Sequence, residues 1–189
     1  MCQRKDGCKM PIQVYFFKVK TPLGDLPALA SDRVIYYLGY RVEDARTFAS
    51  RHHLALQPGE GPLAAPLSRA LAAYFTGQTK DFSLPIQALG TPFQRLVWQA
   101  LREIPYGQTA SYQAIARAIG RPQACRAIGG ANHHNPLSII IPCHRVIRAD
   151  GSLGGYGGGL AQKKYLLDLE QAGLEGSLAK PSEKGYDKA

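Results

Sequence analysis

The sequence predicts a mixed α/β (α+β) protein in two parts, a small sheet with helices followed by a mainly helical half. Between residues 11 and 40, β-branched and aromatic runs alternate with Pro-Leu-Gly and Ser-Asp turn signals, which is typical of short antiparallel strands. Beyond residue 89 the apolar residues recur at helical spacing instead. At 189 residues and 45% apolar composition, the chain can bury one ordinary core or two small ones.

The first part is predicted to contain a short antiparallel sheet and two helices. Strand signals cover 12–30 and 33–40, and helical patterns cover 42–53 and 63–77. The second helix has the clearer pattern, because its leucine, alanine and aromatic residues share one face and Gly77 ends it. The predicted organisation is an N-terminal tail at 1–10, a first domain at 11–88, a second domain at 89–176 and a disordered polar tail at 177–189.

The second part opens with a helix over 91–107. Thr91 is placed to cap it, Pro92 suits its first position, and Gln94 completes a capping box. The apolar residues follow the spacing of one buried face, namely Phe93, Leu96, Val97, Ala100, Leu101 and Ile104. This helix is therefore expected to pack on the core.

Two shorter helices follow, with Gly120 between them. The first begins at Ser111, and the second runs from Pro122 to about 134. Such a pair resembles a helix-turn-helix, although a plain helical hairpin has the same pattern. The second helix is unusually rich in small residues: Ala124, Ala127, Gly129, Gly130 and Ala131. Because small residues let a backbone approach another surface closely, we expect this helix to dock into a narrow groove.

A thiol follows an apolar run. Residues 139–142 predict a buried strand stopped by proline, which places Cys143 at the strand's end. Neighbours in an extended chain point to opposite sides, so His144 is expected to reach the thiol through a water. Glu170, on a helix predicted over 159–173, is the candidate carboxylate to orient that histidine. An alternative without any catalytic role also accounts for these residues. Cys143 would then be an ordinary buried cysteine, His144 an incidental neighbour and Glu170 a helix residue that faces water.

Charge and composition indicate the partner and the compartment. A net charge of +9 favours an acidic partner such as nucleic acid, although a solvated basic surface has the same charge. No stretch approaches the roughly 18 to 20 apolar residues of a membrane span, and the first ten residues lack the apolar region of a secretory signal. We expect a cytoplasmic protein, or a nuclear one in a eukaryote, with its four cysteines reduced.

Taken together, these motifs resemble those of a known family. The segments that carry the resemblance are "TPFQRLVWQALREIPYG", "GQTASYQAIA", "CRAIGGANHHNP", "IPCHRVI" and "GSLGGYGGGLAQKKYLLDLE". They are similar to those of the O(6)-alkylguanine-DNA alkyltransferases, also called methylated-DNA-protein-cysteine methyltransferases, which repair DNA directly. The resemblance is dense over 91–176. Upstream it is looser, but the order of sheet and helices agrees with the family's ribonuclease-H-like N-terminal domain.

The resemblance implies a role for each residue of the reaction. Cys143 would take the alkyl group from O(6)-alkylguanine, with O(4)-alkylthymine as a second candidate substrate, in a single turnover that leaves a stable thioether. His144 would act through a water and be oriented by Glu170. Tyr112 would donate a proton or hydrogen bond to N(3) of the base, and Asn135 would hold the turn before the cysteine.

The resemblance also implies how double-stranded DNA is bound. The damaged base would leave the stack, since its O(6) atom cannot be reached inside the duplex. Arg126 would take its place, and Tyr156 and Gly157 would form the wall of the base pocket. The other residues implied to contact DNA are Ser111, Ala127, Gly129 and Ala131.

No cofactor is expected, and the chain is expected to act as a monomer. Some family members bind a structural zinc through N-terminal cysteine and histidine residues; the candidates here are Cys2, Cys8, His52 and His53, which lack the usual spacing of zinc ligands. Two other functions remain open. A cysteine hydrolase would use the same Cys143, His144 and Glu170 but would turn over, and an alkyltransferase-like module would bind lesions without repairing them.

Overall fold

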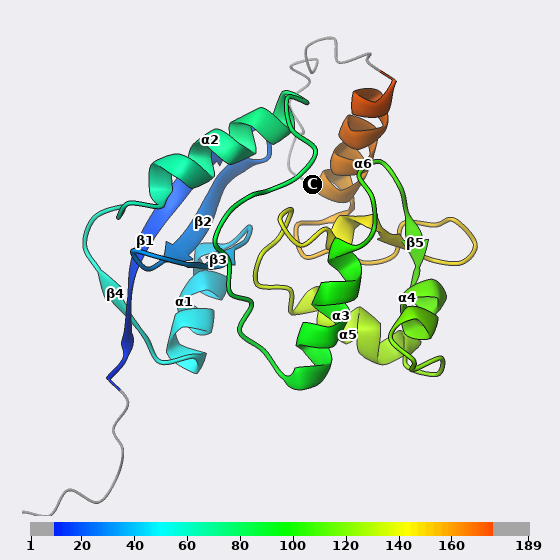
Figure 1. Cartoon of the computed structure of the whole chain (residues 1–189), viewed down its shortest axis with the longest axis horizontal. Helices are drawn as coiled ribbons and strands as arrows, with labels where there is room; N and C mark the ends of the chain where they lie inside the picture. Colours follow the sequence, from blue (N-terminus) through cyan, green and yellow to red (C-terminus); the bar gives the residue numbers. More distant parts are fainter. Residues whose placement is uncertain (1–9, 176–189) are drawn as a thin grey trace, which may run out of the picture.

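The computed structural model describes residues 10–175, which form a sheet-containing half and a helical half (Figure 1). Strands β1 (Ile12–Thr21) and β2 (Gly24–Ala30) form a hairpin, and β3 (Ile35–Leu38) pairs antiparallel with β2. These three match the predicted strands. A fourth strand, β4 (Leu54–Gln57), was missed, and it lies parallel to β1 in the order β3-β2-β1-β4. The sheet is therefore mixed rather than wholly antiparallel as predicted.

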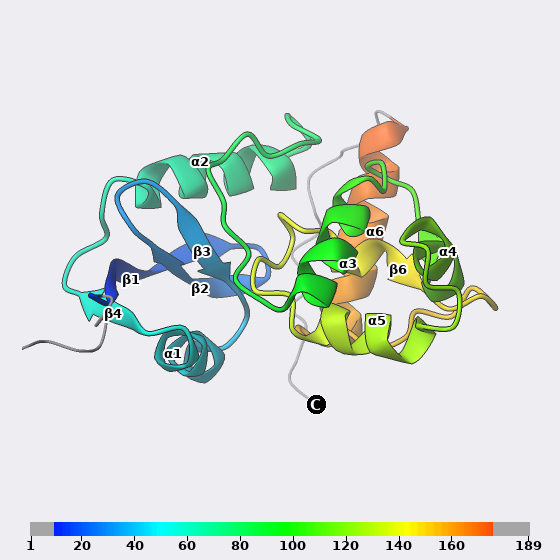
Figure 2. The ribbon, with the colours of Figure 1, turned by 60° about the horizontal axis from the view of Figure 1, so that its bottom comes forward.

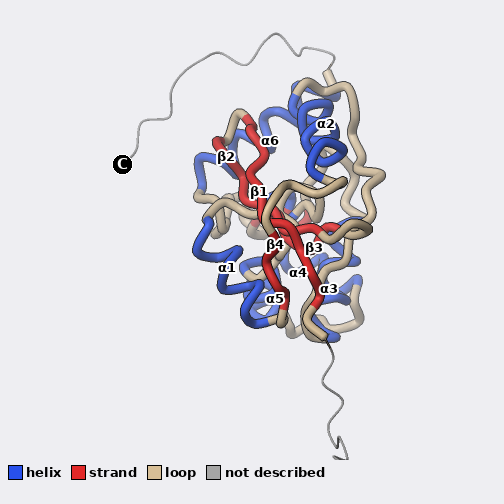
Figure 3. Tube along the Cα trace, turned by 90° about the vertical axis from the view of Figure 1, so that its left-hand side faces the viewer, coloured by secondary structure: helices blue, strands red, loops and turns tan. Residues whose placement is uncertain are grey.

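Two helices cover the two faces of this sheet. Helix α1 (Val42–Arg51) and helix α2 (Ala64–Phe75) lie on opposite sides of the strands (Figures 2 and 3). The face under α2 belongs to the main core, which continues into the helical half, whereas α1 covers a separate smaller cluster. The main core is thus shared by both halves of the molecule.

The helical half contains four helices around the segment that carries Cys143. They are α3 (Pro92–Arg102), α4 (Tyr112–Ala118), α5 (Cys125–His133) and α6 (Leu160–Leu174). A short parallel pair joins β5 (Ala110–Ser111) to β6 (Val146–Ile147). Ser111 caps α4 as predicted, since its side chain accepts a hydrogen bond from the Ala114 N–H. Helix α5 begins three residues later than predicted, at Cys125.

Helix α3 confirms the predicted cap but corrects the predicted face. The Thr91 side chain accepts from the Gln94 N–H, and the Gln94 side chain accepts from the Thr91 N–H, which is a complete capping box. Leu96 was expected inside, yet it is 39% exposed, whereas Trp98 is buried. Trp98 reaches across to α5, where its indole N–H donates to the Ala131 carbonyl at 2.9 Å. The helical spacing of apolar residues favours burial of Leu96. Trp98 is buried instead, because its ring fills more volume and its N–H finds a hydrogen-bond partner.

The predicted strand over 139–141 is wrong. Ile139 has φ +72°, in the left-handed region that an extended strand does not use, and the chain turns there. Hydrogen bonds from the Ile140 N–H to Ser138 and from the Ile141 N–H to Leu137 close this turn. The isoleucines are buried, as predicted, but as a turn in the core. Cys143 consequently begins a 3-10 helix, η1 (Cys143–Arg145), and does not end a strand.

The edge strand β3 joins the two halves. Leu38 donates its N–H to Pro136 and accepts from the Ser138 N–H, while Ile35 makes the same kind of pair with residues 85–87. The sheet edge is therefore covered by two segments of chain, which removes the unpaired groups of an open edge. One of these segments leads directly into the turn before Cys143.

Candidate active site

The thiol of Cys143 is buried and held by one side chain. It is 6% exposed, and the Asn135 side-chain amide donates to its sulfur at 3.1 Å. The same amide nitrogen donates to the Ile141 carbonyl at 2.8 Å, and the Asn135 side-chain oxygen accepts from the Leu137 N–H. Asn135 therefore fixes both ends of the turn and contacts the sulfur as well.

Glu170 lies at the centre of a fully buried cluster of hydrogen bonds. Its carboxylate accepts from four groups: the His144 ring at 2.9 Å, the Arg145 guanidinium at 2.9 Å, the Tyr74 hydroxyl at 2.7 Å and the Gly107 N–H at 2.9 Å. Burial by itself raises the pKa of Glu170, but the hydrogen bonds from His144 and Arg145 outweigh it and hold that pKa at about 2. The carboxylate is therefore ionised at neutral pH.

The Glu170 carboxylate determines which nitrogen of His144 carries the proton. An ionised carboxylate only accepts hydrogen bonds, so the proton of the neutral ring lies on Nε2. Burial lowers the pKa of His144 more than the neighbouring carboxylate raises it, which keeps the ring neutral. Within residues 10–175, the buried Nδ1 has no hydrogen-bond partner. A neutral imidazole with a free nitrogen is able to accept a proton.

Cys143 and His144 share no direct hydrogen bond in the described part of the chain, as expected. Successive residues of a 3-10 helix diverge by about 120°, so their side chains leave the backbone in different directions. The absence of a direct bond is thus confirmed, although its premise, an extended chain, was wrong; the link through a water stays a prediction.

A buried cation near the thiol was missed by the sequence reading. Lys163, on α6, is fully buried, and its ammonium donates to the Val146 carbonyl at 2.6 Å and to the Leu153 carbonyl. Burial lowers its pKa to about 8, while the Cys143 thiolate raises it. Burial also raises the pKa of Cys143, and the Asn135 hydrogen bond and the Lys163 charge lower it. Lys163 thus favours the reactive thiolate from within the core.

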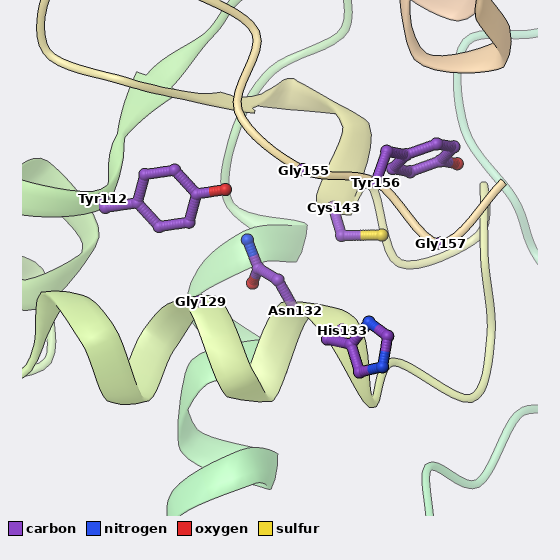
Figure 4. A pocket seen from close by; sticks show the side chains of 8 residues that line it. All are labelled: Tyr112, Gly129, Asn132, His133, Cys143, Gly155, Tyr156 and Gly157. Atoms are coloured by element: carbon purple, nitrogen blue, oxygen red, sulfur yellow. The ribbon is translucent and has the colours of Figure 1, made fainter. Parts of the chain in front are cut away.

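The thiol opens into a cavity of about 210 Å³ (Figure 4). Its lining residues are Tyr112, Gly129, Asn132, His133, Cys143, Gly155, Tyr156 and Gly157. Tyr112 and Tyr156 stand on two sides of the sulfur, and α5 forms the floor. The structure therefore brings five of the predicted residues, Tyr112, Gly129, Cys143, Tyr156 and Gly157, to one cavity, whose volume suits a flat aromatic ligand.

Asn132 is a second residue that the sequence reading missed. Its side chain points toward Tyr112 in Figure 4 and interacts with the Tyr112 hydroxyl, which by itself lowers the pKa of that hydroxyl. Within residues 10–175, however, neither of its two buried polar atoms makes a hydrogen bond of normal geometry. Buried amide groups are normally paired, so an open amide at a cavity wall is a place where a ligand can bind. Burial, followed by the Cys143 thiolate, raises the pKa of Tyr112 and keeps its hydroxyl protonated.

The exposed side of α5 carries most, but not all, of the residues predicted to contact DNA. Arg126 and Ala127 are exposed. A side-chain carbon added at Gly129 would meet only the Tyr112 ring, at 3.9 Å, and one added at Gly130 would meet nothing. Ala131, in contrast, is 3% exposed and packs toward α3, so its side chain does not belong to this face. The hydroxyl of Ser111 is engaged in the α4 cap.

Two of the four candidate zinc ligands, His52 and His53, lie in the part of the chain that the structure describes. Cys2 and Cys8 lie outside the described residues. His52 stacks against Phe48 with ring centroids 4.4 Å apart. Among residues 10–175, no group of three or more His, Cys, Asp or Glu side chains is arranged to hold a metal ion.

Comparison with known proteins places the chain in a family. A family model described as "6-O-methylguanine DNA methyltransferase, DNA binding domain" matches residues 92–172. A methylated-DNA–protein-cysteine methyltransferase of Mycobacterium tuberculosis is 43% identical over 159 residues, which cover 84% of this chain and 93% of that protein. The chain belongs to this family. The resemblance recognised in the sequence is therefore confirmed.

Another relative and a solved structure match a similar share of the chain. The constitutive methyltransferase of Bacillus subtilis is 42% identical over 162 residues, covering 83% of this chain and 95% of its own. A crystal structure of Mycobacterium tuberculosis OGT in complex with DNA aligns with a TM-score of 0.73 and 41% identity, covering 86% of this methyltransferase and 94% of that one. The sheet and the helical half are thus both part of the family fold.

Proposed function

We propose that this methyltransferase repairs double-stranded DNA by moving the alkyl group of O(6)-alkylguanine, and also of O(4)-alkylthymine, to Cys143. The observation that carries the proposal is the position of the thiol. It opens into a cavity of about 210 Å³ whose floor is the small-residue helix α5, so a base leaving DNA bound on α5 enters directly above the sulfur. Each monomer acts on one lesion and needs no cofactor.

The reaction is a single displacement. The Cys143 sulfur attacks the alkyl carbon, a carbon–sulfur bond forms, and the bond between that carbon and O(6) breaks. The bonding electrons stay with the guanine, and the hydroxyl of Tyr112 supplies a proton or hydrogen bond to N(3) so that the base does not leave as a bare anion. The product is a thioether with no electrophilic carbonyl, which water does not reverse, so the protein is consumed.

The buried cluster prepares the thiolate. Nδ1 of His144 takes the thiol proton through one water, and the imidazolium formed is stabilised by Glu170 at 2.9 Å. Asn135 and Lys163 stabilise the negative sulfur by a hydrogen bond and a positive charge. The thiol is thus activated by groups that are already in place before DNA binds.

DNA binding uses the open face of α5. The backbone at Gly129 and Gly130 approaches the minor groove, and Arg126 fills the gap left by the flipped base. Tyr156 and Gly157 form the wall of the base pocket, with the Gly157 N–H directed to O(6). Within residues 10–175 no helix has the length and apolar character to span a membrane. We propose that the reaction takes place in the cytoplasm, or in the nucleus of a eukaryote.

Intact-protein mass spectrometry tests this function. After mixing with a duplex containing O(6)-methylguanine, the protein should gain one methyl group in place of one hydrogen, with peptide mapping placing it on Cys143. Cys143→Ala should gain nothing and still bind the duplex, because α5 is untouched. Transfer onto Cys125 in that variant would contradict the assignment. An unchanged wild-type mass together with cleavage of ester substrates would instead indicate a cysteine hydrolase.

A further inference from the structure

The sheet-containing half reaches the active-site cavity through Tyr40. This residue follows β3, and its hydroxyl lies 2.7 Å from the hydroxyl of Tyr156, a hydrogen bond in which either oxygen can donate. The two rings meet edge to face, with centroids 5.6 Å apart. The Tyr40 ring also lies against Gly158, where an added side-chain carbon would come within 2.7 Å of it. Tyr156 in turn lines the cavity with Cys143, and its ring centroid is 6.5 Å from that of His144.

Tyr40 is held in place by the residues before it. Leu38 is hydrogen-bonded on both sides to residues 136–138, the turn that leads to Cys143. Gly39 donates its N–H to the Pro27 carbonyl at 3.1 Å, which ties the chain back to β2. The Tyr40 side chain therefore starts from a backbone that the sheet and the active-site turn both fix.

The loop that carries Tyr156 has few other contacts to fix it, among them the hydrogen bond from the Gly159 N–H to the Tyr156 carbonyl at 3.0 Å. Residues 154–159 are all glycine except Tyr156. Glycine loses more conformational freedom on folding than any other residue, so such a loop needs contacts to hold one conformation. The only large side chain in this stretch is the one that Tyr40 binds. Burial raises the pKa of both phenols, so both hydroxyls stay protonated and the pair persists at physiological pH.

We propose that Tyr40 is a positioning residue for substrate binding, which holds Tyr156 as the wall of the base pocket. The sheet-containing half thereby contributes to binding of the base without touching the reacting atoms. This inference rests on the proposed function, since it assigns Tyr40 a part in the same pocket. Activation of the thiol and binding of the base are then controlled separately. The Glu170 cluster activates the thiol, and Tyr40, which follows β3, holds the pocket wall in place.

Tyr40→Phe tests the inference with the smallest change. The ring and its edge-to-face contact remain, but the hydroxyl of Tyr156 loses its partner. Single-turnover kinetics with free O(6)-benzylguanine should show a half-saturating concentration about three- to tenfold higher, the range expected for one hydrogen bond. The maximal rate at saturation and the rate of Cys143 alkylation by iodoacetamide should stay within about twofold of wild type, because the hydroxyl that is removed bonds to Tyr156 and the groups that prepare the thiol are unchanged.

Matched variants separate this role from general stability. Tyr156→Phe removes the same hydrogen bond from the other side and should raise the half-saturating concentration similarly, and the double variant should show less than the sum of the two effects. Tyr37→Phe, on β3 itself and in the smaller core cluster, should leave the half-saturating concentration unchanged. Thermal unfolding of each variant shows whether it is folded, and Tyr156→Phe reports on the pair if Tyr40→Phe does not fold.

The outcomes also separate this inference from the proposed function. If wild type takes up no alkyl group, the proposed function is wrong. If wild type reacts and Tyr40→Phe binds benzylguanine equally well, or loses only maximal rate, Tyr40 is not a positioning residue for the pocket. Additive effects in the double variant would likewise overturn the inference, because they would show that the two hydroxyls act independently.

Discussion

The Glu170 cluster and the glycine-rich loop at 154–159 meet at the same site, where the His144 and Tyr156 rings lie edge to face, but they are built in opposite ways. The Glu170 carboxylate is fully buried and accepts hydrogen bonds from four different groups. The loop has one large side chain among five glycines, and an added side-chain carbon at Gly155 or Gly157 would meet nothing within 4 Å. The first region is fixed from all sides, whereas the second is fixed mainly at Tyr156.

This difference assigns separate tasks to the two regions. A nucleophile needs its charged neighbours preorganised, because reorganising them during the reaction would raise the barrier. A base pocket must admit a flipped base and its alkyl group, so it benefits from open space and a wall that can adjust. Variants in the buried cluster should therefore affect the chemistry with every substrate, and variants at the open side should affect only some substrates.

The largest effect is expected for Glu170→Gln. The substitution leaves Arg145 buried without its counter-ion and replaces one of the two accepting oxygens with an NH2 donor, so the His144 proton is no longer fixed on Nε2. Breaking a buried ion pair costs about 3 to 5 kcal/mol of unfolding free energy, measurable by denaturant titration. Alkyl transfer should slow with duplex and with free benzylguanine alike. A loss confined to the duplex would contradict the role of Glu170 in preparing the thiol.

The same carboxylate predicts acid sensitivity. Its pKa falls from an ordinary 4.5 to about 2 on folding, so the folded state binds fewer protons than the unfolded state in this interval. The stability contributed by Glu170 is therefore present above pH 4.5 and is lost as the pH falls toward 2. In Glu170→Gln, the unfolding free energy should fall less steeply between these pH values than in wild type. Equal slopes would show that other carboxylates account for the acid sensitivity.

Arg126→Ala should slow the reaction with duplex DNA but not the reaction with the free base. Arg126 is exposed on α5 and touches no member of the Glu170 cluster, so the thiol remains prepared. Filling the gap left by a flipped base offsets an unstacking energy of a few kcal/mol. Single-turnover transfer from a duplex should therefore slow by about tenfold or more, while the rate with free benzylguanine stays near wild type. Equal losses with both substrates would mean that Arg126 supports the thiol and does not act in flipping.

Lys163→Met should produce a smaller change in the chemistry itself. Methionine has a similar length but no charge, so it removes the cation that lowers the pKa of Cys143. The pH profile of iodoacetamide reaction with Cys143 should move to higher pH. Lys164→Met, on the exposed side of the same helix, is the matched control and should leave the profile unchanged. An unshifted profile for Lys163→Met would show that its two carbonyl contacts, not its charge, explain its burial.

Sequence patterns predicted the elements of this fold better than its turns and buried charges. The capping box at Thr91 and the cap at Ser111 are local signals, and the structure confirms both. The isoleucine run at 139–141 was wrongly predicted to be a strand. A buried turn and a buried strand can have the same composition, and only the positive φ of Ile139 distinguishes them here. The parallel strand β4 carries too short an apolar run to be distinguished from a loop.

Within the site, the residues with a distinctive motif were predictable and their supporting partners were not. Cys143, Asn135 and Tyr112 stand in segments that resemble the family closely. Lys163 looks like an ordinary surface lysine on a charged helix, and its burial depends on carbonyls at Val146 and Leu153, which are distant in sequence. Tyr40 has no motif at all. Its partner lies 116 residues away, and only the fold brings the two hydroxyls together.

The smallest effect, and the one with the most informative sign, is expected for Asn132→Leu. Both polar atoms of the Asn132 side chain are buried beside Tyr112 at the cavity wall, and neither makes a sound hydrogen bond among the described residues. Because the amide interacts with the Tyr112 hydroxyl only outside normal hydrogen-bond geometry, replacing it with an apolar group of similar shape should change the unfolding free energy little. The free base should nevertheless bind about two- to tenfold more weakly, because it loses a hydrogen-bonding group on that wall.

The contrast with Asn135→Leu makes this prediction decisive. The Asn135 amide is paired with the Ile141 carbonyl and the Cys143 sulfur, so its loss should lower the unfolding free energy by about 1 to 3 kcal/mol. Asn132→Leu should instead unfold at nearly the same denaturant concentration as wild type and still bind benzylguanine more weakly. Destabilisation of both variants to the same extent would show that Asn132 is paired in solution. The open side of the site would then be as fully satisfied as the Glu170 cluster, and the comparison between the two regions would fail.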